Sequence, residues 1–261
     1  MKTISIINLK GGVGKTTTAV NLAYALGEEM GYRVLLVDND KQGNASQHYG
    51  VHSYDATSIA DIFEGNTSFT ADAIVETGYN NIDMIPANMD LLDANVHLIY
   101  DAVPQHHLLR HALDAVRDDY DLCIIDNAPD INMTTINALA ASDFVVVPVN
   151  SDAYATDGID RMMDIIEDSR EFNPKIQLAG CVLCKYQNNA ANQQMMQFLQ
   201  SYPQYQVFDT KIRLTPKIDE STFYRAPVFD YSPRSAATAD YREFAAELLA
   251  RIGDEGAERD G

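Results

Sequence analysis

A glycine-rich segment near the start of the chain, Lys10–Thr17, contains the residue types that bind nucleotide phosphates. It follows an apolar run and precedes a segment with helical periodicity, so its backbone N–H groups can point at phosphate oxygens beside a helix N-terminus. Lys15 would neutralise the β- and γ-phosphates, and Thr16 would ligate Mg²⁺. The candidate nucleotide-binding residues are Lys10, Gly11, Gly12, Val13, Gly14, Lys15, Thr16 and Thr17.

This segment is a variant of the ordinary phosphate-binding loop. The pattern G-x-x-x-x-G-K-[ST] requires glycine where this chain has Leu9, and a second lysine, Lys10, stands at the front. A glycine-rich turn by itself would indicate only a tight connection between a strand and a helix. Because lysine, threonine, the preceding strand and the following helix all agree, we favour a phosphate site over that simpler explanation.

Acidic residues follow two other apolar runs. Asp38 and Asp40 come after Val34–Val37, and Asp126 ends a later run. Each acid alone is equally consistent with a solvated loop residue. However, the carboxyl ends of parallel strands meet at one edge of a sheet, where a carboxylate can hold a magnesium-bound water. We therefore expect Thr16, Asp38 and Asp126 to form a magnesium site.

The elements that must position these residues are apolar strands alternating with helices. This pattern predicts an α/β fold with a mostly parallel, twisted sheet covered by helices on both faces. Residues 39–81 are the part of the sequence whose elements are least readable. The expected strands are Ile4–Asn8, Val34–Asp38, Ile82–Pro86, Leu122–Asp126, Phe144–Asn150, Gln177–Tyr186 and Gln206–Phe208. The expected helices are Thr16–Met30, Asp90–Arg117, Thr134–Ala141, Ala155–Glu171, Ala190–Ser201 and Thr238–Ile252.

Composition limits the class of protein. The chain has 261 residues, 46% of them hydrophobic, which suffices for a large core. Its net charge of −19 excludes a simple basic protein that coats nucleic acid. Three cysteines cannot make a disulfide scaffold, and there is neither a signal peptide nor an apolar run of membrane-spanning length, so we expect a cytoplasmic protein. We expect one domain, residues 1–252, and a disordered acidic tail, residues 253–261.

Together these motifs resemble the ParA/MinD family of ATPases, which have the P-loop NTPase fold. Lys10–Thr17 resembles the deviant Walker A motif of that family, and Asp126–Pro129 resembles its Walker B segment, D-x-x-P. Asp38–Asn44 resembles the motif D-x-D-P-Q-G-N, with Lys41 in place of proline. Tyr231–Ser235 resembles the branch that partitions chromosomes and plasmids. The resemblance covers nearly the whole chain.

The resemblance implies roles in binding ATP and Mg²⁺. Lys15 would bind phosphate and Thr17 would contact the α-phosphate. Thr16 would ligate Mg²⁺, with Asp38 and Asp126 in the outer shell of the ion.

It also implies an ATP-sandwich homodimer. Lys10 would reach across the dimer interface to the ATP of the partner subunit, and Asp40 would orient the attacking water. Lys10 and Lys15, from two chains, would stabilise charge on the γ-phosphoryl group, so the implied catalytic residues are Lys10, Lys15 and Asp40. Since closure would assemble the site, the isolated enzyme should be slow.

The partitioning branch further implies that the ATP-bound dimer binds double-stranded DNA without sequence preference. Basic residues would contact the DNA phosphates, and residues 181–242 hold 7 basic against 5 acidic residues, whereas residues 28–180 hold 7 against 27. Ordinary surface charges are the simpler alternative. The candidate DNA contacts are Lys185, Lys211, Arg213, Lys217, Arg225 and Arg234.

A protein partner is implied as well. It would be a centromere-binding, ParB-like adaptor whose basic N-terminal segment stimulates hydrolysis, and the acidic stretch 28–180 would attract such a segment. A membrane partner is not expected, because the last helix has two arginines against two glutamates, with no lysine or tryptophan, and an acidic tail follows it.

We therefore expect an ATP-hydrolysing protein that positions plasmid, chromosome or mobile-element DNA and associates with the nucleoid when bound to ATP. One alternative is an ATP-dependent regulatory switch that recruits protein partners without binding DNA. Another is a small-molecule kinase or transferase on the same scaffold. Lys10 disfavours this last class.

One further motif, Cys181-x-x-Cys184, is discounted. It lies within an expected strand, where positions three residues apart face opposite sides. A single pair cannot form a four-thiolate site, so we expect no metal or redox role for it.

Overall fold

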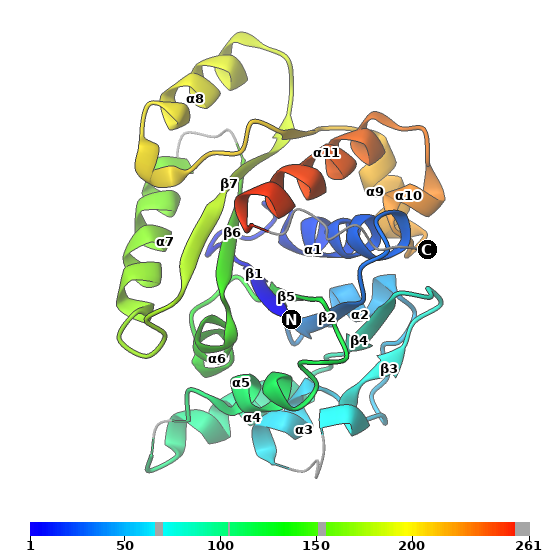
Figure 1. Cartoon of the computed structure of the whole chain (residues 1–261), viewed down its shortest axis with the longest axis vertical. Coiled ribbons are helices and arrows are strands. Elements are labelled where there is room, and N and C mark those ends of the chain that lie inside the picture. The colour runs from blue at the N-terminus through cyan, green and yellow to red at the C-terminus, as the bar shows by residue number, and fades with distance from the viewer. Residues whose placement is uncertain (66–69, 104, 151–154, 254–261) are drawn as a thin grey trace.

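One mixed sheet organises the part of the chain that the structure describes, residues 1–65, 70–103, 105–150 and 155–253 of a computed structural model. The strand order is β3-β4-β2-β5-β1-β6-β7-β8, and every neighbouring pair is parallel except β3 with β4 (Figure 1). The strands are β1 (Lys2–Ile6), β2 (Val34–Asn39), β3 (Val75–Glu76), β4 (Ile82–Ile85), β5 (Leu122–Asn127), β6 (Phe144–Asn150), β7 (Gln177–Tyr186) and β8 (Lys211–Arg213).

Helices cover both faces of this sheet. In Figure 1, α1 and α11 lie side by side over one face, whereas α3, α4 and α5 lie together over the other. The helices are α1 (Lys15–Tyr24), α2 (Asn44–His48), α3 (Ile59–Glu64), α4 (Asp90–Tyr100), α5 (Leu108–Ala115), α6 (Met133–Ala141), α7 (Ala155–Ser169), α8 (Ala190–Gln200), α9 (Pro216–Phe223), α10 (Val228–Tyr231) and α11 (Ala236–Arg251). A π-helical turn, Ala25–Glu29, continues α1, and short 3₁₀ turns span Thr70–Ala73 and Pro203–Tyr205.

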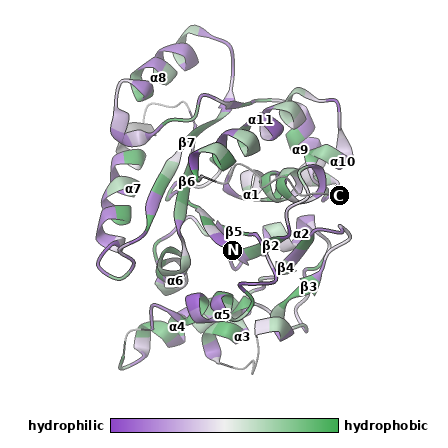
Figure 2. Cartoon of the chain, in the orientation of Figure 1, coloured by the Kyte–Doolittle hydropathy of each residue, from purple (hydrophilic) through white to green (hydrophobic). Residues whose placement is uncertain are grey.

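The alternation of side chains along β2 explains the two layers. Leu36 is buried in one cluster with Leu22 of α1 and Phe244 of α11. Its neighbour Leu35 points to the opposite face, where it is buried in a cluster with Leu91 of α4. Figure 2 shows hydrophilic and hydrophobic residues together on α5, as expected for a helix that packs one face on the sheet. The predicted fold class is confirmed.

Two predicted elements are wrong. The single helix expected over Asp90–Arg117 is two helices, because α4 ends at Tyr100 and the next residue, Asp101, has an extended backbone. Pro104 follows in the sequence, and proline cannot continue a helix. The strand expected at Gln206–Phe208 is also absent from the described residues. Gln206 has φ 45°, which is incompatible with an extended strand, and the edge strand is instead β8.

Residues 39–81, whose elements were least readable in the sequence, form short elements where the structure describes them. Of these, α2 and α3 have five and six residues, too few to show a helical period. Ser58 and Asp61 form a capping box at the start of α3. At the other end of the chain, residues 254–261 of the expected tail lie outside the described residues. Within the described ranges, we find no helix both long and apolar enough to cross a bilayer.

Candidate functional site

The glycine-rich segment forms the connection between β1 and α1, at the carboxyl end of the sheet. Gly12 has φ 73° and Gly14 has φ 99°, both in the left-handed region that favours glycine. Gly14 is the N-cap of α1, so the loop leads directly into the helix N-terminus. Val13, between these two glycines, is buried with 1% exposure, so its apolar side chain takes no part in binding a ligand. This geometry is that of a phosphate loop.

Lys15 is the first residue of α1, and its side chain turns back into the loop. Its Nζ atom donates a hydrogen bond to the carbonyl of Lys10 at 3.1 Å. Burial lowers the pKa of the Lys15 ammonium, and the nearby carboxylates of Asp126 and Asp40 oppose that shift. The structure thus brings together the loop lysine and the strand-end acids that the sequence placed far apart.

Asp38 and Asp126 occupy equivalent positions at the ends of β2 and β5, and both are completely buried. Asp38 accepts hydrogen bonds from Ser46 N at 2.8 Å, Ser46 Oγ at 2.7 Å and the backbone N–H of Asp40 at 3.1 Å. Burial nevertheless raises the pKa of Asp38 to about 6. Burial, and then the Asp38 charge, hold the pKa of Asp126 well above its ordinary value.

Asp126 has the character expected of a cation-binding carboxylate. Neither of its oxygens has a hydrogen-bond partner of acceptable geometry among the described residues. The Thr16 hydroxyl and the Lys15 ammonium oppose the rise in its pKa without cancelling it. Within the described ranges, no cluster of three or more His, Cys, Asp or Glu side chains could hold a metal alone. A hydrated Mg²⁺ that also binds nucleotide phosphates fits this donor set, because it needs few protein ligands.

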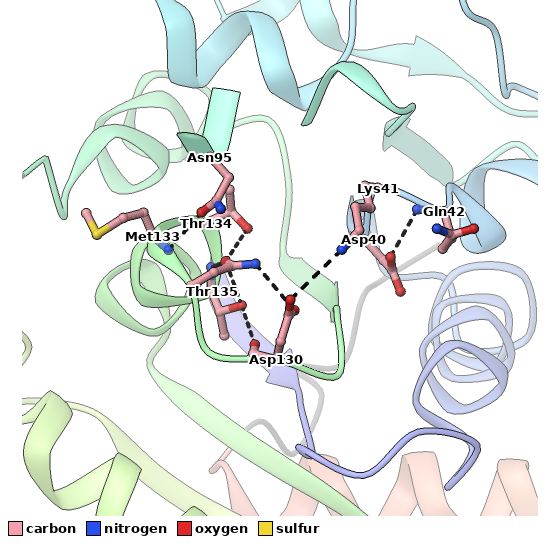
Figure 3. A network of polar contacts seen from close by, with 9 residues as sticks. Asp40, Lys41, Gln42, Asn95, Asp130, Met133, Thr134 and Thr135 are labelled. Atoms are coloured by element: carbon pink, nitrogen blue, oxygen red, sulfur yellow. Dashed lines mark hydrogen bonds and ion pairs between the residues drawn. The ribbon is translucent and has the colours of Figure 1, made fainter. Parts of the chain in front are cut away.

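The loop after β2 is tied to the loop after β5. The Asp40 carboxylate accepts a hydrogen bond from Gln42 N at 3.0 Å and is 9% exposed. Figure 3 shows the next residue, Lys41, extending toward Asp130, with 3.9 Å between Lys41 Nζ and Asp130 Oδ2. The carbonyl of Asp130 accepts from Thr135 Oγ1 at 2.9 Å. The lysine that replaces the family proline therefore links the Asp40 loop to α6.

Sequence reasoning missed a pair of buried asparagines directly beyond the two acids. Asn39 and Asn127 are register partners, and Asn39 Nδ2 donates to Asn127 Oδ1 at 2.9 Å. Asn127 Nδ2 in turn donates to Ser5 Oγ at 3.2 Å on β1. These bonds join the ends of three strands and fix the acids beside them. The signal in the sequence was an asparagine after an acid at the end of each strand, Asp38-Asn39 and Asp126-Asn127.

The remaining members of the predicted nucleotide site lie in the same loop. The backbone N–H of Lys10 donates to Asn8 Oδ1 at 2.9 Å, and the carbonyl of Thr17 accepts from Asn21 Nδ2 at 2.8 Å. Gly11, between Lys10 and Gly12, is exposed. The predicted roles of all these side chains toward a nucleotide stay predictions.

The six basic residues predicted to contact DNA have different surroundings. Arg213 forms an ion pair with Asp240, whose side chain is only 6% exposed. Lys217 pairs with Glu220 at 2.6 Å. Lys211 lies over the ring of Tyr186. Arg225 and Arg234 are exposed, and Lys185 contacts the phosphate loop.

Comparison with known proteins finds relatives along nearly the whole chain. A family model described as an AAA domain matches residues 1–178. The chromosome partitioning protein ParA of Caulobacter vibrioides is 34% identical over 259 residues, covering 97% of this chain and 96% of that protein. The sporulation initiation inhibitor protein Soj of Bacillus subtilis is 35% identical over 252 residues, covering 95% and 98%.

A solved structure is similar over the same length. Cobyrinic acid a,c-diamide synthase from Mycobacterium smegmatis, with bound ATP analog and magnesium, has a TM-score of 0.83 and 28% identity, covering 98% of this chain and 97% of that one. The fold and the phosphate loop define a P-loop NTPase. More particularly, the chain belongs to the ParA/Soj family of AAA-domain proteins, as its resemblance predicted.

Proposed function

We propose that this chain is an ATP-hydrolysing DNA-partitioning protein that works as an ATP-sandwich dimer. The observation that carries the proposal is the buried Lys15 ammonium beside the strand-end acids Asp126 and Asp40, at a loop that leads into a helix N-terminus. Relatives of nearly equal length, one of them named for chromosome partitioning, support the biological role.

ATP binds with its phosphates on the backbone N–H groups of residues 11–17. Lys15 neutralises phosphate charge, and Thr17 lies within the same turn for the α-phosphate. Thr16 ligates Mg²⁺, with Asp38 and Asp126 holding its waters. Bound Mg²⁺ would neutralise the negative charge that develops on the β- and γ-phosphate oxygens.

Hydrolysis needs a water in line with the γ-phosphate and positive charge around it. Asp40, held by the N–H of Gln42, orients that water. Lys10 of a second copy supplies further positive charge at the γ-phosphate, which a single chain does not provide. Turnover is therefore slow until two copies close around the nucleotide and a partner stabilises the closed state.

The dimer binds double-stranded DNA through lysine and arginine, so it associates with the nucleoid in the cytoplasm. Arg225 and Arg234 suit this role best among the candidates, because both are exposed and, unlike Arg213 and Lys217, neither forms an ion pair within the described residues. Lys217 and Lys211 lie at the same C-terminal part of the chain. Arg213 suits it less, since its guanidinium already holds Asp240.

A centromere-binding, ParB-like adaptor with a basic N-terminal segment stimulates hydrolysis and so releases the dimer from DNA. The charge of residues 28–180, 27 acidic against 7 basic residues, favours such a segment electrostatically. Stimulation by the adaptor should then weaken as salt increases. Stimulation that does not change with salt would argue against this assignment.

A second candidate is an ATP-dependent switch that recruits protein partners and does not bind DNA. The acidic partners of Arg213 and Lys217, together with the net charge of −19, favour it. The experiment that distinguishes these two candidate functions measures retention of the protein on duplex DNA of random sequence, with ATP and with ADP. Partitioning predicts ATP-dependent retention that Arg234→Glu or Lys217→Glu abolishes and that Arg161→Glu, on α7, leaves intact.

One observation favours the third class of protein, a small-molecule kinase or transferase. The similar structure from M. smegmatis is named as a synthase. ATP hydrolysis in the absence of any organic acceptor would exclude a kinase or transferase. Hydrolysis that starts only when an acceptor is added would overturn the partitioning proposal.

A further inference from the structure

The carboxyl end of β7 forms one wall of the phosphate loop, although some 170 residues separate the two in the chain. A Cβ atom placed on Gly14 would lie 3.7 Å from the Cβ of Cys184. The hydroxyl of Thr18 lies 3.9 Å from Cys184 Sγ. The next residue, Lys185, donates a hydrogen bond from Nζ to the carbonyl of Gly12 at 2.8 Å. The sequence placed Lys185 among the DNA contacts, but its partner is the loop itself.

The backbone of Lys185 is also unusual. Its φ is 53°, and within the described residues it shares a positive φ with only two other non-glycine residues, Gln206 and Arg225. Such a conformation is unfavourable for a side chain larger than asparagine. Surrounding contacts must hold it in place, and the bond from Lys185 to Gly12 is one of them.

Peptide geometry gives this contact a consequence for phosphate binding. In a trans peptide the carbonyl of one residue and the N–H of the next point in opposite directions. The Gly12 oxygen accepts from Lys185 and also from Asn150 Nδ2, at 3.5 Å. Holding this oxygen therefore fixes the direction of the Val13 N–H, a donor in the centre of the loop.

We propose that Lys185 is a positioning residue of the phosphate loop. Its ammonium holds the Gly12 carbonyl so that the Val13 N–H faces the opposite side, toward the phosphates, and it offsets the negative end of that carbonyl dipole beside a polyanion. This inference rests on the proposed function only in that it requires a bound nucleotide. Lys185 then belongs to the nucleotide site and not to the DNA surface.

The test compares the full chain with Lys185→Met and Lys185→Arg, using a fluorescent ADP so that neither dimerisation nor DNA is needed. Methionine keeps the Cβ, and thus the backbone strain, but loses the donor and the charge. Lys211→Met is the matched control, because it removes the same charge from the neighbouring strand β8. The melting temperature without nucleotide is measured for each protein.

We expect Lys185→Met to bind ADP about tenfold more weakly, as for the loss of one hydrogen bond from a charged donor. Lys185→Arg should restore binding, and Lys211→Met should bind like the wild type. The nucleotide-free melting temperature of Lys185→Met should fall only slightly, because one of several contacts that hold the strained backbone is lost. Equal ADP affinity of Lys185→Met and wild type would overturn the inference, as would a loss of DNA retention by Lys185→Met at saturating ATP. If the wild type itself fails to bind nucleotide, the proposed function is what falls.

Discussion

Asp38 and Asp126 lie side by side as register partners near the ends of the parallel strands β2 and β5, and neither residue has exposed surface. Two carboxylates buried side by side are unfavourable, and the charge of Asp38 raises the pKa of Asp126 in addition to the effect of burial. The Lys15 ammonium compensates only in part. A cation brought to this position with a nucleotide would relieve the remaining repulsion.

Removing one of these charges should therefore stabilise the nucleotide-free protein. Asp126→Asn is expected to raise the free energy of unfolding by about 1 to 2 kcal/mol, because one of two neighbouring buried carboxylates becomes a neutral amide. The same variant should lose the additional stability that Mg²⁺ and ATP give the wild type. Urea unfolding with and without Mg²⁺ and ATP measures both effects. Asp219→Asn, at an exposed acid on α9, should change neither, and a destabilised Asp126→Asn would contradict this electrostatic account.

Asp40 should matter for hydrolysis and not for nucleotide binding. Asp40→Ala is expected to reduce ATP turnover by about 100-fold, a typical loss for a group that orients the reacting water, and to leave ATP affinity within a few fold of wild type. The ATP-bound dimer should then accumulate. Phosphate release and nucleotide titration measure the two quantities, with Asp72→Ala, an exposed acid, as the control. Normal turnover by Asp40→Ala would remove Asp40 from the mechanism.

Arg213 should prove structural. Its guanidinium is bonded to both oxygens of Asp240, and the N–H of Arg213 also donates to Asp240 Oδ2 at 2.9 Å. Arg213→Ala leaves that carboxylate buried without its charge partner, so we expect a loss of about 2 kcal/mol in the free energy of unfolding. Chemical denaturation measures it, and Arg225→Ala, at an exposed arginine, is the control. An Arg213→Ala protein as stable as wild type would make Arg213 available as a DNA contact.

The three cysteines should be inert in the folded protein. Cys123, Cys181 and Cys184 are buried, and burial raises the pKa of Cys181 and of Cys184 to about 12. The thiolate, which is the reactive form, is therefore scarce at pH 8. A colorimetric disulfide reagent should titrate none of these thiols within minutes in the native protein and all three in guanidinium chloride. Rapid native reaction of two thiols would revive a redox role for the Cys181–Cys184 pair.

The sequence predicted best those features that a single residue type enforces. Glycines at the positions of positive φ, lysine beside them and apolar strands ending in acids led directly to the phosphate loop and to the order of strands and helices. Long helices such as α11 were found to within two residues, because their apolar period extends over several turns. In contrast, a single helix was predicted over Asp90–Arg117, although the sequence has a proline at position 104, between the residues of α4 and those of α5.

Features that depend on contacts between distant residues could not be found in this way. The bond from Lys185 to Gly12 spans 173 positions, and no local pattern distinguishes that lysine from Lys211 or Lys217. Gln206 has a left-handed backbone, which excludes a strand there, and its carbonyl accepts a hydrogen bond from Arg251 of α11, a contact that no local pattern reveals. The asparagine pair beyond the two acids becomes visible only when the strand register is known.

In the proposed dimer, one nucleotide is held by lysines from two copies of the chain. Light scattering after size-exclusion chromatography, with ATP and Mg²⁺ and with Asp40→Ala to prevent hydrolysis, tests it directly. The molecular mass should double with ATP and stay monomeric with ADP, and it should stay monomeric with ATP when Lys10→Ala is added, although that protein still binds ATP. A dimer that forms equally well without Lys10, or a monomer under every condition, would contradict the account.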